Sequence, residues 1–326
     1  MRSVFLAFAL IAAAISCASN DPIKTSGTGG ASETGGASST GGKTGTGGAS
    51  STGGKTGSGG TPGTGGKTGT GGTSAAISCT DVSGATSSVT TQYGGTSIAL
   101  DGNSGKNYYM LANWWGSPYS NQQETLSGVG FTMTNPNNVT TSVKDNPLGF
   151  PTIFIGAYQG HSTAGSNLPK QVSSLTSVPT IFSTNGTQKG MANYNATYDV
   201  WFTSSSSPLS SSQTTPGSGG AYLMVWLFPP TEKQPRGTIR RSGSKVTGVS
   251  GWWTAWVDDT NPPCISYVSD DNLDSLEFDL NKFIQDAITH SYGVTSSQYL
   301  SVIFTGFEVW GGGDGLQIKK YCASVE

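Results

Sequence analysis

Two side chains in the C-terminal half of the sequence are of types that can carry acid–base or nucleophilic chemistry. Glu308 stands between Phe307 and Val309, and Trp310 follows. Apolar neighbours raise the pKa of a carboxyl group, because burial disfavours the charged form. A carboxyl that keeps its proton near neutral pH suits general acid catalysis. The alternative for Glu308 is a solvated strand residue, and the motif around it favours the acid.

Tyr222 opens the run Tyr-Leu-Met-Val-Trp at 222–226. Side chains alternate between the two faces of a strand, so Tyr222, Met224 and Trp226 share one face. A phenol with a pKa near 10 is almost wholly protonated at pH 7, which makes Tyr222 a poor nucleophile without a strong base beside it. The same side chain can stack on a ligand or form a hydrogen bond with it.

Other kinds of catalytic site find little support. His161 lies in a polar loop and His290 at the end of a predicted helix, with no Ser-His-Asp order and no metal-ligand spacing. Asp270 and Asp271 could bind Ca²⁺ weakly, but such a pair is more typical of a solvated turn. We therefore expect no metal and no cofactor.

The N-terminus has the pattern of an export signal. Residues 4–15 are apolar and follow Arg2, and this run of about 12 residues is too short to span a bilayer. Ala-Ile-Ser-Cys at 14–17 is typical of a lipobox, which predicts a signal peptide at 1–16 and a lipid on Cys17. The alternative is ordinary secretory cleavage near Ala14 or Ala18. Lipidation would hold the chain on a bacterial membrane, surface-exposed or periplasmic; otherwise the protein is secreted.

Residues 17–76 follow as the lipidated cysteine and a linker rich in Gly, Ser and Thr. A block of the type Thr-Gly-Gly-Lys-Thr-Gly recurs from Thr40, Thr52 and Thr64. These repeats hold no apolar residue that could offset the entropy of ordering them, so we interpret the segment as a flexible tether.

Residues 77–326 have the composition of one all-β domain, and all eight Trp of the chain lie there. Charged residues are 11% of the chain and the net charge is −2. This excludes the basic stripe that nucleic-acid binding needs and suits a neutral polymer such as a polysaccharide. We expect a monomer. Cys79 and Cys322, near the two ends of the domain, are a possible disulfide, although the sequence leaves the pairing open.

Many short segments alternate or are rich in β-branched and aromatic residues, and clusters of Gly, Asn, Pro and Ser separate them. This spacing predicts a sandwich or jelly roll. The predicted strands cover 97–100, 106–112, 128–134, 152–158, 192–202, 221–227, 251–257, 276–280, 299–310 and 315–321. One helix is predicted over 281–290, with Asn281 as its N-cap. In the strand at 251–257, Trp252 and Trp256 share a face and Trp253 points the other way, so one of the two faces belongs to the core.

Six segments, in the same order, resemble the motifs of glycoside hydrolase family 12, the small β-jelly-roll endo-β-1,4-glucanases. They are Ala-Asn-Trp-Trp-Gly at 112–116, Gly-Phe-Pro-Thr-Ile-Phe at 149–154, Asn-Leu-Pro-Lys-Gln-Val-Ser-Ser at 167–174, Asn-Tyr-Asn-Ala-Thr-Tyr-Asp-Val-Trp-Phe at 193–202, Phe-Asp at 278–279 with the helix, and Gly-Phe-Glu-Val-Trp at 306–310. The resemblance covers nearly all of 79–326. It implies two antiparallel sheets with a concave glucan cleft and one α-helix.

The resemblance also implies roles. Glu308 matches the general acid/base, whereas Tyr222 stands where the family has its nucleophilic Glu. Asp199 matches a carboxylate beside the nucleophile, and here it could hydrogen-bond Tyr222 or act as base for a water in an inverting reaction. The predicted substrate-binding residues are Asn113, Trp115, Met224, Trp226 and Trp310; Trp201 is a further candidate for the cleft.

Three hypotheses follow. The first is a surface-tethered endo-β-1,4-glucanase or related β-glucanase, based on the motifs, Glu308 and Asp199. The second is a catalytically inactive β-glucan-binding lipoprotein, based on Tyr222. The third is a structural envelope protein, which requires the aromatic residues of the cleft to be buried.

Overall fold

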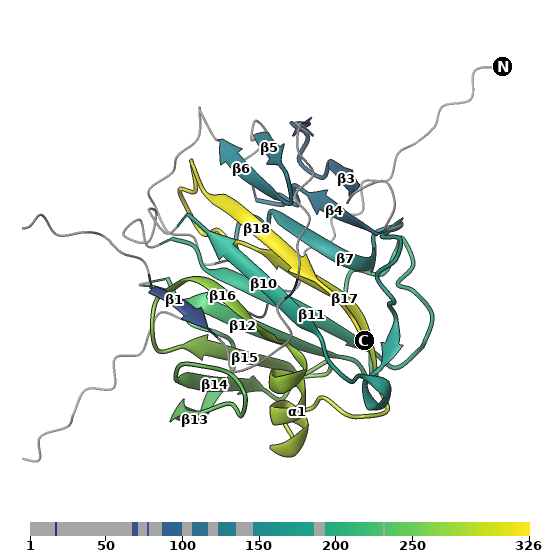
Figure 1. Cartoon of the computed structure of the whole chain (residues 1–326), viewed down its shortest axis with the longest axis vertical. Coiled ribbons are helices and arrows are strands. Elements are labelled where there is room, and N and C mark those ends of the chain that lie inside the picture. The colour runs from purple at the N-terminus through teal and green to yellow at the C-terminus, as the bar shows by residue number, and fades with distance from the viewer. Residues whose placement is uncertain are drawn as a thin grey trace, which may run out of the picture. The chain divides into compact units, whose positions relative to one another are not determined.

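The computed structural model of the chain describes two stacked β-sheets and one α-helix (Figure 1). The residues it describes are 17, 67–70, 77, 87–99, 106–116, 123–134, 146–185, 193–230 and 232–326. All of them belong to one compact unit of the chain. Within these ranges no helix has both the length and the apolar character needed to cross a membrane.

The smaller sheet has seven strands. Their order is β1 (Lys67–Thr70), β16 (Leu273–Asp279), β10 (Pro179–Thr184), β18 (Gln317–Ala323), β6 (Gly130–Thr134), β5 (Gln123–Ser127) and β2 (Ser88–Val89). Strand β1 lies inside the segment predicted to be a tether, and it pairs in parallel with β16. At these four residues the chain is therefore an ordered strand.

The larger sheet has eleven strands. The order along its main path is β13 (Thr238–Ser244), β14 (Trp253–Asp258), β15 (Cys264–Ser269), β12 (Ala221–Phe228), β11 (Ala196–Thr203), β17 (Tyr299–Gly306), β7 (Thr152–Tyr158), β4 (Asn107–Leu111) and β3 (Gly95–Ala99). The short β8 (His161–Ser162) pairs with β7, and β9 (Lys170–Gln171) pairs with β17. A 3-10 turn, η1 (Val172–Ser174), follows β9.

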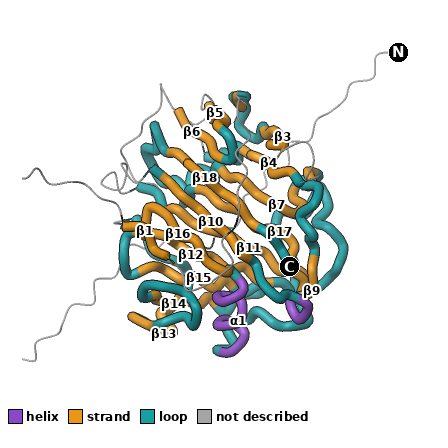
Figure 2. Tube along the Cα trace, in the orientation of Figure 1, coloured by secondary structure: helices purple, strands orange, loops and turns teal. Residues whose placement is uncertain are grey.

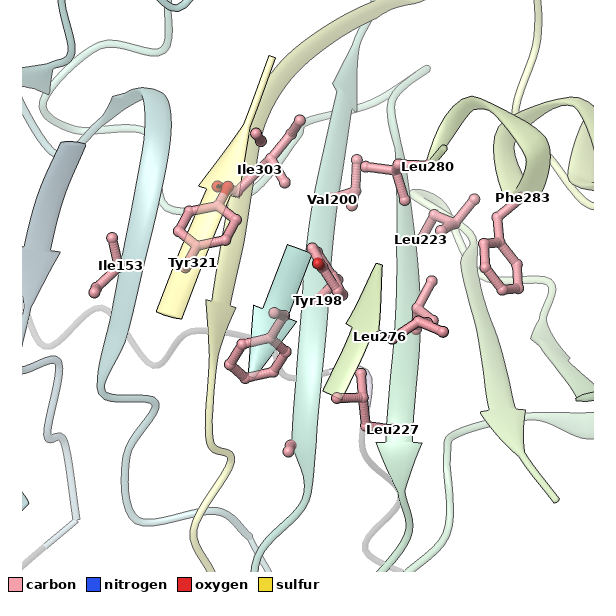
Figure 3. Packing of buried hydrophobic residues seen from close by; sticks show 14 of the residues in the cluster. Ile153, Tyr198, Val200, Leu223, Leu227, Leu276, Leu280, Phe283, Ile303 and Tyr321 are labelled. Carbon is pink, nitrogen blue, oxygen red and sulfur yellow. Dashed lines mark hydrogen bonds between the residues drawn. The ribbon is translucent and has the colours of Figure 1, made fainter. Parts of the chain in front are cut away.

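The core between the sheets forms because alternate residues of each strand point inward. In β12 these are Leu223, Val225 and Leu227, and they meet Leu276 from the smaller sheet (Figure 3). All eight residues of β12 are buried, so its other face is covered as well.

The single helix, α1 (Asn281–Thr289), covers one end of this core (Figure 2). Its Phe283 is fully buried and packs edge-on against Trp253. The predicted N-cap was wrong: the N-cap is Leu280, and the backbone N–H of Asn281 donates to the side chain of Asp279. That carboxylate also accepts from the backbone of Val178, a contact far away in sequence that no local pattern could indicate.

The predicted jelly-roll sandwich with one helix is confirmed for the described residues. Two strand pairs, β1 with β16 and β12 with β15, are parallel in sheets that are otherwise antiparallel. Strands β5, β10, β13 and β15 were not predicted, and neither were the short strands β1, β2, β8 and β9.

Candidate functional site

The face of the larger sheet opposite to the core carries a second cluster of apolar side chains. We call it the aromatic face. Its main members are Tyr109, Phe154, Trp201, Tyr222, Met224, Trp226, Phe304 and Trp310. They lie there because they alternate with the core residues of the same strands; Tyr222 and Met224, for example, flank the inward-pointing Leu223.

A line of neighbouring residues on this face, which we call the row, crosses the whole sheet. Residues directly opposite each other on paired strands point to the same side, and the pairing connects one residue from each strand of the main path. In order, these are Ser97, Tyr109, Phe154, Phe304, Asp199, Met224, Ser266, Trp256 and Ile239. The row runs perpendicular to the strands, so a polymer chain lying along it would touch every strand.

Glu308 lies four residues beyond Phe304 of this row, just past the end of β17. The strand predicted to reach residue 310 ends at Gly306, but Val309 continues the alignment by bridging to Tyr194. Glu308 is 2% exposed. The Asn195 side chain donates to Glu308 Oε2 at 2.5 Å, and its own oxygen accepts from the Glu308 N–H at 3.0 Å. The carboxylate is thus held in one orientation by a residue that immediately precedes the neighbouring strand β11.

Asp199 lies in the row itself; the residue is partly buried, and its Oδ1 atom is fully buried. Burial raises its pKa to about 8, and the charge of Glu308 adds to the rise. The indole N–H of Trp201 lowers the pKa by more than the Glu308 charge raises it, although the two groups do not meet hydrogen-bond geometry. Asp199 therefore keeps its proton at neutral pH. A carboxyl in this state can donate a hydrogen bond or a proton, whereas the base for water considered above has to be ionised.

Tyr222 lies on the other side of the row from Glu308. It pairs with Trp201, whose ring meets it edge-on at 5.3 Å. Burial raises the pKa of Tyr222 well above its ordinary value of 10, and the charge of Asp199 raises it further. The phenol therefore stays protonated, and a protonated phenol is a poor nucleophile.

Five buried polar atoms of the aromatic face have no hydrogen-bond partner among the described residues. They are Asp199 Oδ1, Tyr222 Oη, and the indole nitrogens of Trp201, Trp226 and Trp310. Buried polar atoms are nearly always hydrogen-bonded, and an unsatisfied one is costly. If the aromatic face served only for packing, these five atoms would stay without hydrogen bonds. A ligand with many hydroxyl groups could form hydrogen bonds with them.

The predicted sugar-binding pair sits at the start of this region. Trp115 is partly buried and packs against the aromatic face. Asn113 is buried, and its backbone has the left-handed conformation, with φ 51°. The adjacent Trp114 points the other way into the core, where its indole donates to Glu124 at 2.6 Å. The roles of Asn113 and Trp115 in sugar binding remain predictions.

Met224, Trp226 and Trp310 all lie on the aromatic face, and the rings of Trp226 and Trp310 are 6.5 Å apart. Trp226 and Trp310 are fully buried. This burial is what the structural-protein hypothesis required, but their unpaired indole nitrogens argue for a ligand.

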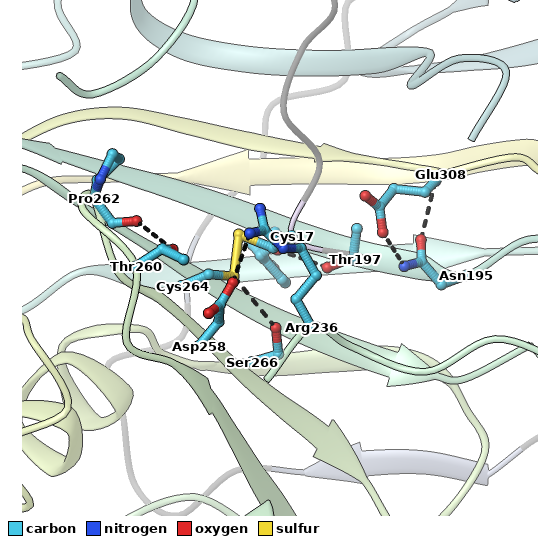
Figure 4. Close-up of a disulfide and its surroundings, with 11 residues drawn as sticks. Cys17, Asn195, Thr197, Arg236, Asp258, Thr260, Pro262, Cys264, Ser266 and Glu308 are labelled. Carbon is cyan, nitrogen blue, oxygen red and sulfur yellow. Dashed lines mark hydrogen bonds and ion pairs between the residues drawn. A yellow bond between two sulfur atoms is a disulfide. The ribbon is translucent and has the colours of Figure 1, made fainter. Parts of the chain in front are cut away.

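Cys17 forms a disulfide with Cys264 (Figure 4). Cys264, on β15, is the strand partner of Tyr222 on β12. The carbonyl of Cys17 accepts from the backbone N–H of Arg236 at 2.8 Å. Cys17 therefore covers part of the aromatic face beside Tyr222. One sulfur cannot hold both a disulfide and a thioether-linked lipid, so the structure describes the disulfide form of the site predicted to be lipidated.

Cys322 is also in a disulfide, while its predicted partner Cys79 lies outside the described residues, so that pairing stays a prediction. Across the part of the chain that the structure describes, no three His, Cys, Asp or Glu side chains gather as a metal site would require.

The sequence interpretation missed Asn195 and Cys264. Asn195 could have been found, because it shares the face of Asp199 by the period-2 rule. Cys264 could not, because its partner is 247 residues away.

The chain resembles known proteins in sequence and in fold. Residues 106–326 match the sequence model described as glycosyl hydrolase family 12. A protein named probable cellulase Cel12b from Mycobacterium tuberculosis is 29% identical over 49% of this chain and 99% of its own length. Endoglucanase S from Pectobacterium parmentieri is 26% identical over 67% of this chain and 82% of its own. The structure of endoglucanase cel12A from Rhodothermus marinus superposes with a TM-score of 0.60 at 26% identity, covering 74% of this chain and 99% of that one.

Proposed function

Because the chain belongs to glycosyl hydrolase family 12, we propose that it binds β-1,4-glucan along the aromatic face and hydrolyses it internally, as an endoglucanase does. The observation that carries the proposal is the set of five unpaired polar atoms around the row. A glucan offers hydroxyl groups to those atoms and apolar ring faces to the aromatic side chains.

In this proposal Glu308 and Asp199 are the two carboxyl groups of the reaction. Glycosidases need one carboxyl that carries a proton and one that is ionised. The raised pKa of Asp199 keeps the proton there at rest. The amide of Asn195 donates to Glu308 Oε2 and holds the second carboxyl group in place. In this proposal Glu308 is therefore the base, and Asp199 takes the acid role that the resemblance implies for Glu308.

Tyr222 has no covalent role in this proposal, because its phenol stays protonated. A retaining reaction through a covalent glycosyl intermediate would need an ionised group at that position. Hydrolysis by Glu308 and Asp199 acting on a water would invert the anomeric configuration. Determining the anomer first released from a cello-oligosaccharide tests this, and a retained configuration would exclude it.

The second candidate function is capture of β-glucan without cleavage, which the neutral phenol at Tyr222 favours. Reducing-sugar release from β-glucan separates the two functions. Wild-type release that disappears in Glu308→Gln and in Asp199→Asn supports hydrolysis by the pair. Binding without release, together with release that appears only in Tyr222→Glu, supports capture.

We also propose that the protein is exported. The apolar run at 4–15 supports this, and so does the Cys17–Cys264 disulfide, since disulfides persist in oxidising compartments. A lipid on Cys17 would anchor the protein to a membrane and leave Cys264 as a thiol. Cleavage near Ala14 without lipidation would keep the disulfide. The mass of the N-terminal peptide from the exported protein distinguishes the two forms.

A further inference from the structure

The row of the aromatic face does not end at Met224. It continues through Ser266 on β15 to Trp256 on β14 and Ile239 on the edge strand β13. Ile239 is 51% exposed and Trp256 is partly exposed, whereas Trp226 is fully buried. The far end of the row is therefore an accessible platform made of one aromatic and one branched apolar side chain.

Polar pairs lie on both sides of Trp256 along its own strand. Thr254, two residues before it, donates to Asp270 at 2.8 Å. Asp258, two residues after it, forms an ion pair with Arg236 at 2.7 Å (Figure 4). Both pairs belong to the same face as Trp256, because side chains two apart share a face. An apolar ring with hydrogen-bonding groups on two sides is the chemistry that recognises a sugar ring and its hydroxyls.

We propose that Trp256 and Ile239 form an outer subsite that holds a distant part of the same β-1,4-glucan chain. This inference rests on the proposed function, and it adds a preference for long chains over short oligosaccharides. Neighbouring strands lie about 4.8 Å apart, so Trp256 is roughly 10 Å and Ile239 roughly 14 Å from Met224 across the sheet. That span is comparable to a disaccharide or slightly more, so a short oligosaccharide centred at Asp199 would not reach Trp256.

The same strand offers a matched control. Trp252 is 50% exposed and precedes Trp256 by four residues, which places it about 13 Å away along the strand and off the row. The ammonium group of Lys245 lies 4.1 Å from the centre of the Trp252 ring and donates to the carbonyl of Gly251. The Lys245 side chain thus already covers one face of the Trp252 ring, whereas the ring of Trp256 is partly exposed near the end of the row.

The test measures the affinity of wild type, Trp256→Ala, Trp256→Tyr and Trp252→Ala for hydroxyethyl cellulose and for cellotriose. To exclude cleavage, each variant also carries Glu308→Gln, and thermal unfolding verifies the fold. We expect Trp256→Ala to weaken polymer binding on the order of tenfold, which corresponds to 1.4 kcal/mol, and to leave cellotriose binding within about twofold. Trp256→Tyr keeps an aromatic ring and should retain most of the affinity, and Trp252→Ala should retain all of it.

Polymer binding that is unchanged in Trp256→Ala, or equally weakened in Trp252→Ala, would overturn the outer subsite while leaving the proposed function intact. An equal loss for polymer and cellotriose would also overturn it, because Trp256 would then belong to the central site. Failure of the Glu308→Gln background to bind either ligand would defeat both the proposed function and the subsite.

Discussion

Asn195 and Glu308 are joined by three hydrogen bonds. The Asn195 amide donates to the Glu308 carboxylate, the Asn195 side-chain oxygen accepts from the Glu308 N–H, and the Asn195 N–H donates to the Glu308 carbonyl. Two of these bonds fix the backbone just beyond β17, and the third fixes the carboxylate. A catalytic carboxylate needs its position held in this way before substrate arrives.

Asn195→Ala removes the amide that holds Glu308. We expect glucan hydrolysis to fall by at least about tenfold, because the carboxylate loses its fixed orientation. The free energy of unfolding should fall by roughly 1–3 kcal/mol, since a buried hydrogen-bonding group loses its partner. Reducing-sugar assays and urea unfolding measure the two effects. Asn195→Ala with unchanged turnover would show that Glu308 needs no such support.

Asp199 gives the fold a predictable pH dependence. Its pKa is raised from 3.8 to about 8, so the folded protein binds more protons than the unfolded chain between these pH values. The stability contributed by this group is therefore complete below pH 4 and is lost as the pH rises towards 8. Asp199→Asn is uncharged at every pH and should escape the loss. We expect its stability relative to wild type to increase between pH 4 and pH 8, on the order of a few kcal/mol in total.

Urea unfolding of both proteins at several pH values measures this difference. The prediction fails if the two stability curves run parallel from pH 4 to pH 8, because Asp199 would then titrate as an ordinary exposed carboxyl.

Glu124, which lies away from the site, should also make the stability of the fold depend on pH. Burial raises its pKa from 4.5 to about 7, although the hydrogen bond from Trp114 opposes the rise. Stability should fall as the pH rises through this window, by an amount on the order of 3 kcal/mol. Glu124→Gln keeps an oxygen for the Trp114 indole and should remove this part of the dependence without changing glucan turnover. A variant with the wild-type pH profile of stability would contradict the prediction.

The sequence predicted best those elements whose own residues are apolar and alternate. Strand β12 was expected at 221–227 and runs from Ala221 to Phe228, because both of its faces are buried. Strand β13 was missed: its residues Thr-Ile-Arg-Arg-Ser-Gly-Ser hold one large apolar side chain, and the ladder to β14 makes it a strand. The carboxyl and aromatic residues of the site followed from motifs and the period-2 rule. The order of the row did not, because register across nine strands depends on contacts distant in sequence.

Tyr222→Phe tests the role of the phenol directly. The Tyr222 hydroxyl has no hydrogen-bond partner among the described residues, so its removal should leave the fold unchanged or stabilise it by about 1 kcal/mol. Glucan hydrolysis should fall by no more than about threefold through the lost hydrogen bond to the glucan, because this hydroxyl neither attacks nor carries a charge. A loss of tenfold or more, without loss of fold, would instead assign a catalytic part to the phenol.

Cys264→Ser breaks the link between the N-terminal region and β15. In the exported, oxidised protein we expect the free energy of unfolding to fall by roughly 2–4 kcal/mol, because the disulfide no longer restricts the unfolded chain. Binding of glucan should improve at the same time, since Cys17 covers the face beside Tyr222 and would be free to leave it. Chemical unfolding and glucan affinity are measured on the same samples, and Cys17→Ser should reproduce both effects. If Cys17 carries a lipid instead, Cys264 is a thiol that alkylates without prior reduction, and Cys264→Ser changes neither quantity.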